Sequence, residues 1–197
     1  SPEKDILIKS FSENHRRSIK KAKNENLMIE EVNDIKNMVG FAEGLCKMYA
    51  ARKIPHDLKI EKERLKNLFK FVIEKKNGFI LEVRKQTQLL GGIVLIRHNK
   101  SIFYLLGFSD PDFKNIPVNH LLFLESFERA KSLGCIYFDF GGYGRSGQAD
   151  AQVLNINRFK DGFKGKRIDH PDTLLIAKNS LYKFIYTNYI KIIKGKK

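Results

Sequence analysis

Three strand-like apolar runs near the middle of the chain constrain its fold more than any other feature. They occupy residues 79–83, 92–96 and 102–106, and short polar connections such as residues 98–100 separate them. Runs of this length, bounded by polar turns, are typical of β-strands, and short connections join strands that run antiparallel. The sequence therefore predicts an antiparallel meander of three strands at the centre of the fold.

Segments with helical periodicity surround the predicted meander. Apolar residues recur at helical spacing in four segments, which are residues 12–24, 35–52, 61–74 and 118–132. Ser10 and Glu13 have the spacing of a capping box for the first of these helices, and Gly134 is a stop signal for the last. A short strand is expected at residues 27–29.

A short apolar run at residues 135–140 follows the last of these helices. It predicts a strand that is buried on both faces in a parallel pairing. Further along, residues 173–177 have a strand-like pattern, and a basic helix is expected from Ser180. A meander followed by a helix and a parallel strand gives a mixed, mostly antiparallel sheet with helices on both faces. We therefore expect an α/β (α+β) fold.

The formal net charge of +15 is the strongest signal in the composition. A surplus of this size favours anionic partners, such as nucleic acid, phosphorylated small molecules or an acidic membrane face. A lysine-rich solvated surface without a specific partner explains the same charge equally well. The hydrophobic fraction of 42% is sufficient for a continuous core and excludes a disordered chain.

The distribution of cysteine and histidine argues against a metal or disulfide framework. Cys46 and Cys135 lie far apart and form no CxxC pair, which fits a reducing compartment. The five histidines are scattered without the spacing of metal ligands. No run approaches the roughly 20 apolar residues of a membrane span, and no signal peptide is found, so the cytoplasm is expected. We predict no bound cofactor and no metal.

A glycine-rich loop at residues 142–147 matches the pattern G-x-G-x-x-G. In a dinucleotide site this loop opens a helix within a β-α-β unit, and an acidic residue follows about 20 residues later. Asp161 has roughly that position, but residues 158–163 do not resemble the end of a second parallel strand, and an antiparallel meander precedes the loop. We therefore interpret it as a flexible loop at a strand end, where α/β sheets place their ligands.

Five segments, taken together and in order, resemble a known enzyme family. They are residues 16–22 (Arg-Arg-Ser-Ile-Lys-Lys-Ala), 104–109 (Tyr-Leu-Leu-Gly-Phe-Ser), 117–119 (Pro-Val-Asn), 138–142 (Phe-Asp-Phe-Gly-Gly) and 159–165 (Phe-Lys-Asp-Gly-Phe-Lys-Gly). They are similar to the FemABX-like (Fem family) peptidoglycan peptidyltransferases, FemAB-like GNAT N-acyltransferases that attach amino acids to cell-wall precursors. Lys164 departs from the family's Phe-Lys-x-Gly-Phe-Gly-like pattern. The resemblance implies the GNAT fold, whose order of elements agrees with the order predicted above.

The resemblance also implies a domain organisation. Members of the family usually hold two tandem GNAT domains, and this sequence is similar to the second, C-terminal one. We expect residues 1–197 to form a single GNAT-like domain, in which residues 1–26 contain the helix that leads in from an absent N-terminal domain. The sequence opens at Ser1 without an initiator Met, which agrees with that expectation.

The resemblance places an essential lysine at Lys160, which is our predicted catalytic residue. In acyl transfer the attacked carbonyl becomes an oxyanion, and a fixed cation beside it lowers the barrier by about 3 kcal/mol. The residues expected to bind substrate are Arg52, Tyr104, Asn119, Asp139, Gly141, Gly142 and Phe159.

Several of these residues have a second interpretation. Asp139, at a strand end, can act as a general base, although a structural role in pairing with a cation is favoured. Arg52 can contact substrate phosphates, but arginine is also favoured at a helix C-terminus. Tyr104 either lines the acceptor cleft or packs against the sheet. Gly141 and Gly142 allow the backbone to approach a substrate closely.

The predicted reaction is transfer of an amino acid from an aminoacyl-tRNA ester to an amine of a peptidoglycan precursor. The expected partners are aminoacyl-tRNA and this anionic precursor, a nucleotide- or lipid-linked muropeptide. One alternative is an acyl-CoA donor, although residues 110–117 lack the Gln/Arg-x-x-Gly-x-Gly/Ala loop of ordinary GNAT enzymes. Another is a non-catalytic module that binds RNA or a membrane through its charge. Residues 181–197 fit either a helix at the inner face of an anionic membrane or one docked on the core.

Overall fold

The computed structural model describes residues 2–144, 151–169 and 188 of the 197-residue chain. Residues 1–165 form one compact unit and residues 166–197 form a second, in which residues 166–169 have no regular secondary structure. The strand and the basic helix expected after residue 170 lie outside the described residues. No helix in the described part of the chain is both long and apolar enough to cross a membrane.

The first unit alternates between helical and extended segments in the order that the sequence predicts. Its helices are α1 (Pro2–Ser10), α2 (Glu13–Lys23), η1 (Ile35–Asn37), α3 (Met38–Ala51), α4 (Leu58–Ile73), η2 (Pro111–Phe113), α5 (Val118–Ser132) and α6 (Ala151–Asp161). Its strands are β1 (Met28–Glu31), β2 (Gly78–Lys85), β3 (Gln88–His98), β4 (Ser101–Ser109) and β5 (Tyr137–Asp139). The four predicted helices and the short first strand are therefore confirmed to within a few residues.

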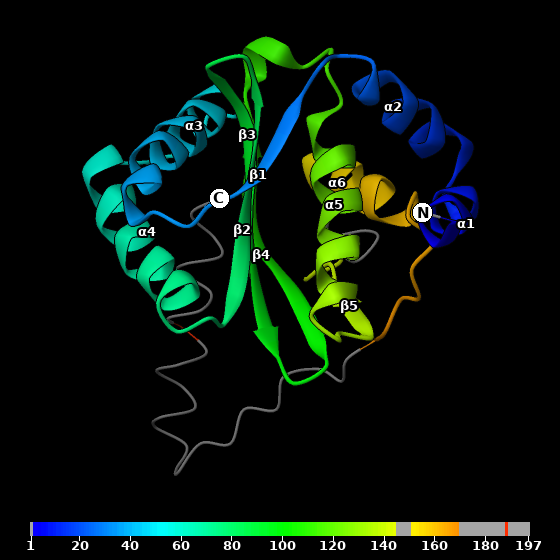
Figure 1. Ribbon diagram of the computed structural model, residues 1–197. Coiled ribbons are helices and arrows are strands. Elements are labelled where there is room, and N and C mark those ends of the chain that lie inside the picture. Colours follow the sequence, from blue (N-terminus) through cyan, green and yellow to red (C-terminus); the bar gives the residue numbers. More distant parts are fainter. Residues whose placement is uncertain (1, 145–150, 170–187, 189–197) are drawn as a thin grey trace. The chain divides into compact units, whose positions relative to one another are not determined.

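One sheet runs through the middle of the first unit, with the strand order β1-β2-β3-β4-β5. The first four strands are antiparallel neighbours, and β5 pairs with β4 in parallel. The predicted meander and the parallel strand after α5 are both confirmed. Helices α3 and α4 cover one face of the sheet, and α5, α6, α2 and α1 lie on the other (Figure 1).

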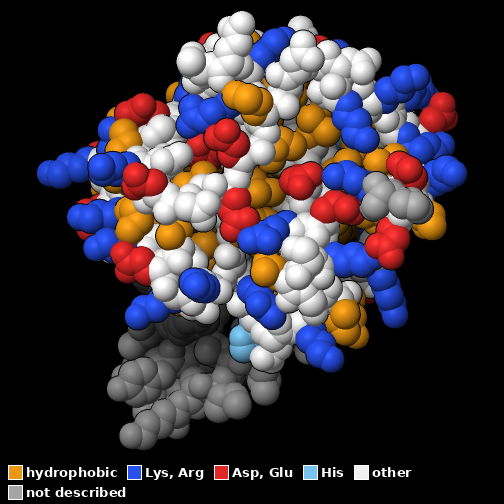
Figure 2. Space-filling model, viewed as in Figure 1, with side chains coloured by type: hydrophobic (Ala, Val, Ile, Leu, Met, Phe, Trp, Pro, Cys, Tyr) orange, Lys and Arg blue, Asp and Glu red, His pale blue; other side chains and the backbone are white. Residues whose placement is uncertain are grey.

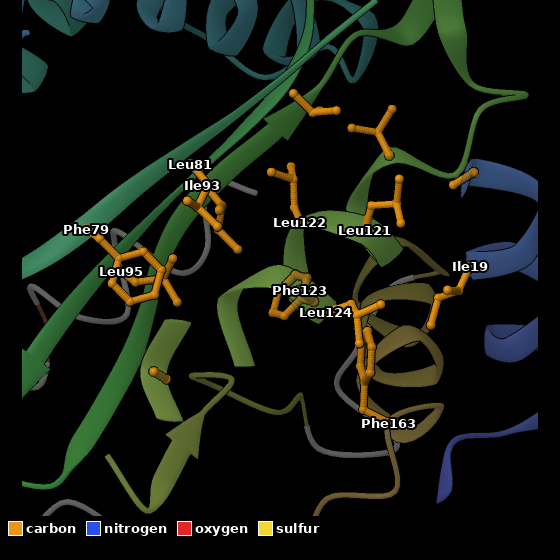
Figure 3. Packing of buried hydrophobic residues seen from close by; sticks show 14 of the residues in the cluster. Ile19, Phe79, Leu81, Ile93, Leu95, Leu121, Leu122, Phe123, Leu124 and Phe163 are labelled. Carbon is orange, nitrogen blue, oxygen red and sulfur yellow. The ribbon is translucent and has the colours of Figure 1, made fainter. Parts of the chain in front are cut away.

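The alternation of side chains along β2 and β3 produces two separate cores, one on each face of the sheet. Phe79 and Leu81 point toward α5, whereas Ile80 between them points toward α3 and α4. On β3, Ile93 and Leu95 likewise face α5. Figure 3 shows Leu122 of α5 turned toward these side chains, whereas Leu121 and Leu124 lie on the side of α5 where Ile19 of α2 and Phe163 are found.

The core beneath α3 depends on two glycines that leave room for aromatic rings. The rings of Phe41 and Phe108 are fully buried and meet edge to face, with 4.9 Å between their centroids. A Cβ atom on Gly44 would lie 2.1 Å from the ring of Phe108, and one on Gly92 would lie 2.6 Å from the ring of Phe41. Burying each ring contributes about 2 kcal/mol to the stability of the fold. The two glycines therefore stabilise the fold by allowing α3 to approach the sheet closely.

The N-terminus of α2 differs from the predicted capping box. Ser12, rather than Ser10, is the N-cap, and its hydroxyl accepts a hydrogen bond from the backbone N–H of His15. Ser10 instead donates to the carbonyl of Leu7 within α1, a helix that the sequence did not predict. A short connection between two helices leaves room for only one cap, and the serine next to the first helical residue occupies it.

The prediction that residues 135–140 form a strand buried on both faces is wrong. The strand β5 has only three residues and is the last strand of the described sheet. Ile136 and Tyr137 each expose 66% of their surface. An apolar run therefore indicated a strand correctly, but it did not indicate how many layers cover that strand.

Candidate functional site

The candidate site begins where β4 and β5 part. The two strands pair for three residues and separate after Phe103 and Asp139, while β4 continues beyond this point. The register between β3 and β4 shifts at the same place, which leaves Leu105 as an extra residue between Tyr104 and Leu106. A bulge of this kind bends its strand and re-aims the neighbouring side chains. The chain that leaves β5 therefore diverges from β4 beside Tyr104.

A tight turn directs the chain as it leaves β5. The carboxylate of Asp139 accepts a hydrogen bond of 2.7 Å from the backbone N–H of Gly141, as in an Asx turn. Gly141 has a φ of +73°, which favours glycine at this position. A Cβ on Gly142 would meet no heavy atom within 4 Å, so this part of the loop faces open space.

The helix α6 holds the glycine-rich loop from the other side. Asn157 exposes only 5% of its surface and makes two hydrogen bonds with the backbone of Gly144. Its amide nitrogen donates to the Gly144 carbonyl at 2.8 Å, and its amide oxygen accepts from the Gly144 N–H at 3.1 Å. The hydroxyl of Tyr143 donates to Asp161 at 2.9 Å. The sequence did not predict α6, which here attaches directly to the loop.

The side chain of Lys160 reaches from the last turn of α6 to this loop. Its Nζ donates to the carbonyl oxygen of Gly142 at 2.5 Å. Burial lowers the pKa of Lys160 below the ordinary lysine value, and the carboxylate of Asp139 opposes that shift. An ammonium group that is partly withdrawn from water and fixed by a carbonyl is prepared to stabilise a negative charge that develops nearby.

Tyr104 lies on β4 on the other side of the loop. Its backbone carbonyl is close to Gly141, where a Cβ would be 3.5 Å away. Burial raises the pKa of its hydroxyl, and the guanidinium of Arg52 at the end of α3 partly offsets that increase. A Cβ on Gly107 would lie 2.8 Å from the backbone carbonyl oxygen of Gly92 and 3.4 Å from the Tyr104 hydroxyl, so it is the neighbouring strand rather than the ring that leaves no room for a side chain here.

A cluster of aromatic side chains lies next to Tyr104 and Lys160. Phe123 of α5 is 5% exposed and lies at its centre. Its ring centroid is 5.2 Å from that of Tyr104 and 5.4 Å from that of Phe159, and it stacks on Phe140 at 5.5 Å. Phe159, which was predicted to bind substrate, is therefore packed among aromatic rings next to Lys160.

The structure brings most of the predicted residues together. Lys160, Asp139, Gly141, Gly142 and Tyr104 are linked by the hydrogen bonds and close contacts described above.

Asn119 is the predicted residue that is least connected to this group. It lies in the first turn of α5, and its amide nitrogen is 3.5 Å from the hydroxyl of Ser109, at the limit of a hydrogen bond.

Two hollows on the surface of the described chain lie on opposite faces of the sheet. One of about 340 Å³ is apolar and borders the site through Phe140, Phe163 and Gly165, beneath the exposed side of β5. The other, of about 620 Å³, lies between α3 and α4 and is lined by lysines. Lys160 lines neither of them, so the candidate site is an open edge of the sheet in the described residues.

Three residues of this region escaped the sequence analysis. His15 and His120 were interpreted as unrelated, yet their rings meet at 4.5 Å between centroids beside Phe159. Neither belongs to a set of His, Cys, Asp and Glu side chains able to hold a metal, because no such set occurs in the described part of the chain. Asn157 is the other, and the only sequence signal for it is a polar residue between the apolar residues of α6.

The connection from β4 to α5 carries acidic side chains rather than phosphate-binding glycines. Lys47 of α3 bridges Asp110 and Asp112, with N–O distances of 2.7 Å to each. Asp110 also caps η2 by accepting from the backbone N–H of Asp112. The Lys47 ammonium offsets part of the negative charge of these carboxylates, and residues 110–117 contain no glycine that would bring a backbone N–H close to a phosphate.

Comparison with known proteins agrees with the fold described above. The family described as "Acetyltransferase (GNAT) domain" matches residues 9–160. No curated protein matches the sequence. Among solved structures, that of FemX is similar with a TM-score of 0.69 and 15% identity, over 81% of this chain and 55% of the FemX chain. The chain therefore spans little more than half the length of FemX.

Smaller acetyltransferases share the fold over most of their own length. A predicted acetyltransferase with acetyl-CoA from Clostridium acetobutylicum has a TM-score of 0.54 and 10% identity, over 77% of this chain and 96% of its own. A ribosomal-protein-alanine N-acetyltransferase from Brucella melitensis biovar Abortus 2308 has a TM-score of 0.53 and 10% identity, over 77% and 99%. At such low identity these structures show the fold alone. The family match covers most of the sequence, and the chain accordingly belongs to the GNAT acetyltransferase domain family.

Proposed function

We propose that this chain transfers an aminoacyl group from an aminoacyl-tRNA to an amine of a peptidoglycan precursor. The observation that carries the proposal is the position of Lys160, a partly buried ammonium held by the Gly142 carbonyl where β4 and β5 diverge. An ammonium has three N–H donors. The Gly142 carbonyl occupies one of them, so the others remain for the carbonyl oxygen of a substrate.

The reaction requires charge stabilisation more than it requires a nucleophile from the protein. The neutral amine of the acceptor attacks the ester carbonyl, a C–N bond forms, and the C–O bond to the ribose oxygen of the tRNA breaks. The amine loses one proton, and the departing ribose oxygen gains one. Lys160 offsets the negative charge on the carbonyl oxygen in the intermediate. The bonds from Asn157 and Gly142 fix the relative positions of loop and helix before substrate binds.

Two features of the chain favour a polyanionic acyl donor over CoA, whose pyrophosphate would lie at the N-terminus of α5. The outer side of α2 presents Arg16, Arg17, Lys20, Lys21 and Lys23, against one acidic residue, Glu13. Lysine and arginine side chains protrude in this region at the upper right of Figure 2. The connection before α5, residues 110–117, lacks the glycine-rich loop that holds the pyrophosphate of CoA in ordinary GNAT enzymes. A basic helix beside a transferase site is suited to the phosphates of RNA.

The acceptor is proposed from the resemblance to the Fem family and from Arg52. The guanidinium of Arg52 lies close enough to Tyr104 to affect the pKa of its hydroxyl, so it borders the same edge of the sheet. Arginine binds phosphate oxygens in a bidentate manner. A nucleotide- or lipid-linked muropeptide offers both a diphosphate and a free amine, and it therefore matches a site that combines Arg52 with Lys160.

Acyl transfer from acyl-CoA is the second candidate. The observation in its favour is that the similar structure from Clostridium acetobutylicum is described with acetyl-CoA and shares the fold over nearly its whole length. The two candidates use the same lysine and differ only in the donor. They are therefore separated by an assay that offers both donors.

The test incubates the full chain with a UDP-linked muramyl pentapeptide and either tRNA charged with radiolabelled amino acids or radiolabelled acetyl-CoA. Label that moves from tRNA to the acceptor supports the proposal, and label that moves only from acetyl-CoA replaces it with the second candidate. Lys160→Ala should lower kcat about 100-fold or more. Arg158→Ala, which removes an exposed cation from the same helix, should leave kcat within about twofold. Salt-sensitive RNA binding without transfer from either donor would overturn both candidates.

A further inference from the structure

A histidine of α2 is buried against the helix that carries Lys160. His15 exposes 6% of its surface and contacts Phe159 and Phe163, with ring centroids 5.3 Å and 4.5 Å from its own. It also meets His120 of α5 edge to face. The imidazole therefore sits where α2, α5 and the end of α6 converge, and it is almost completely removed from water.

The hydrogen bond of His15 determines which of its ring nitrogens carries the proton. Its Nε2 lies 2.9 Å from the carbonyl oxygen of Phe159. A carbonyl oxygen can only accept, so Nε2 carries the hydrogen and donates it. Burial lowers the pKa of His15, although the Phe159 carbonyl opposes the shift. A neutral imidazole with this tautomer is the state that fits the site.

Two carbonyl groups at the end of α6 accept hydrogen bonds from residues around the start of α2, and the Phe159 carbonyl also accepts a longer one, of 3.2 Å, from the Gly162 N–H. The backbone N–H of Ser12 donates to the Gly162 carbonyl at 2.8 Å, and His15 donates to the Phe159 carbonyl. Orphan carbonyls at a helix C-terminus require such partners. These two bonds fix the end of α6 relative to α2.

Gly162 leaves space for the imidazole of His15 because it has no Cβ atom. A Cβ on Gly162 would lie 2.0 Å from Cε1 of His15 and within 2.4 Å of both ring nitrogens. Its φ is not in the left-handed region, so steric space rather than backbone conformation requires glycine here. The end of α6 and the side chain of His15 therefore fit together as a matched pair.

We propose that His15 is a positioning residue for Lys160, which follows directly after the residue whose carbonyl it binds. His15 binds the last turn of α6 through the Phe159 carbonyl, and Lys160 of the same turn binds the carbonyl of Gly142. Loss of the His15 bond allows this turn to move and separates the ammonium from the loop. The inference rests on the proposed role of Lys160, but the position of the lysine can be measured independently of transfer.

A packing role alone does not account for the imidazole. Phenylalanine would fill the same space among Phe159 and Phe163 and would avoid burying polar nitrogens without full hydrogen bonding. His120 provides the matched comparison, because it contacts the same rings but makes no hydrogen bond to α6 in the described residues. A comparison of variants at the two histidines therefore separates the effect of the hydrogen bond from the effect of packing.

The experiment measures the titration of Lys160 by competitive labelling with acetic anhydride across a pH series, followed by mass spectrometry of the peptide that contains it. In the wild-type chain Lys160 titrates below an ordinary lysine. We expect His15→Phe to raise its apparent pKa toward the ordinary value and to lower kcat about tenfold with KM nearly unchanged. His15→Gln, whose amide can donate to the same carbonyl, should restore both. His120→Phe should leave both as in the wild type.

The outcomes distinguish this proposal from the proposed function. An unchanged Lys160 titration in His15→Phe would overturn the positioning role. A shifted titration combined with full transfer activity in Lys160→Ala would preserve the positioning role and overturn the catalytic role of the lysine. Gly162→Ala, which pushes the imidazole away, provides a second variant if His15→Phe does not fold, and it should shift the Lys160 titration in the same direction.

Discussion

The Nζ of Lys160 and the carbonyl oxygen of Gly142 lie 2.5 Å apart, and this contact joins α6 to the loop that leaves β5. It places a cation at the divergence of two parallel strands. A cation fixed in this way needs little reorganisation when charge develops on a substrate, which is the main source of electrostatic catalysis. The same contact also makes the lysine depend on every residue that positions α6.

Replacement of Lys160 by arginine should change the alkaline side of the pH profile. Burial lowers the pKa of Lys160, so an enzyme that requires the ammonium loses activity as pH rises through a value below that of an ordinary lysine. The guanidinium of arginine does not titrate in this range. In Lys160→Arg we therefore expect a lower kcat whose alkaline decline is absent. The measurement is kcat between about pH 6 and pH 10. An identical decline in the variant would assign it to another group.

Loss of the Asn157 side chain should loosen the glycine-rich loop. In Asn157→Ala both hydrogen bonds to Gly144 disappear. Because Asn157 is buried, we expect the free energy of unfolding to fall by about 1–3 kcal/mol. Asn155→Ala on the exposed side of α6 is the control, since its one described bond is to the Arg158 guanidinium, and it should change stability by less than about 0.5 kcal/mol. Urea unfolding monitored by circular dichroism measures both variants, and equal effects would contradict the role of Asn157.

The sheet and its main helices were predictable because their periodicity comes from the core itself. The apolar runs in the centre of the chain predict a sheet with helices on both faces, and the structure confirms it, with Phe79 and Leu81 in one core and Ile80 in the other. Helix α6 lacked such a signal. Its buried residue is Asn157, whereas Leu154 and Ile156 expose more than a third of their surface. Because the buried residue of this helix is polar and two of its apolar residues are exposed, hydrophobic periodicity does not reveal it.

The site was predictable only where residues are close in sequence. Gly141 and Gly142 were expected to let the backbone approach a substrate closely, which stays a prediction, and the structure places Gly141 in a left-handed conformation. The resemblance to the Fem family pointed to Lys160, but neither composition nor spacing distinguishes it from other lysines. The contact between His15 and His120 joins residues that are distant in the sequence. Such pairs arise from the topology of the fold, so no local pattern reveals them.

Alanine at two positions of α3 should have opposite effects on stability. Gly44→Ala places a Cβ 2.1 Å from the buried Phe108 ring, so the helix or the ring must move, at a cost of about 1–3 kcal/mol or more. Gly40→Ala places a Cβ at an ordinary 3.5 Å from Leu89 and should stabilise the helix by about 0.5–1 kcal/mol. Thermal unfolding of the two variants measures the difference. Equal melting temperatures would show that α3 packs less closely than described.

Acid should destabilise the fold through His120. Burial, with a smaller contribution from the neighbouring His15, lowers the pKa of His120 to about 4, and the Pro117 carbonyl opposes the shift. An unfolded histidine binds its proton near pH 6.5, so the unfolded state takes up protons first as the pH falls. The free energy of unfolding is therefore unaffected above about pH 6.5 and decreases between there and about pH 4. Because the ring is not completely buried, we reduce the expected loss to about 2 kcal/mol.

The variant His120→Phe removes this titration. The other histidine of the described aromatic cluster, His15, is still present in the variant. Urea unfolding at pH 7 and pH 4.5 should thus show a smaller loss in the variant than in the wild type. If both lose the same free energy, the proton is taken up elsewhere, and the buried pair is not the acid-sensitive element of the fold.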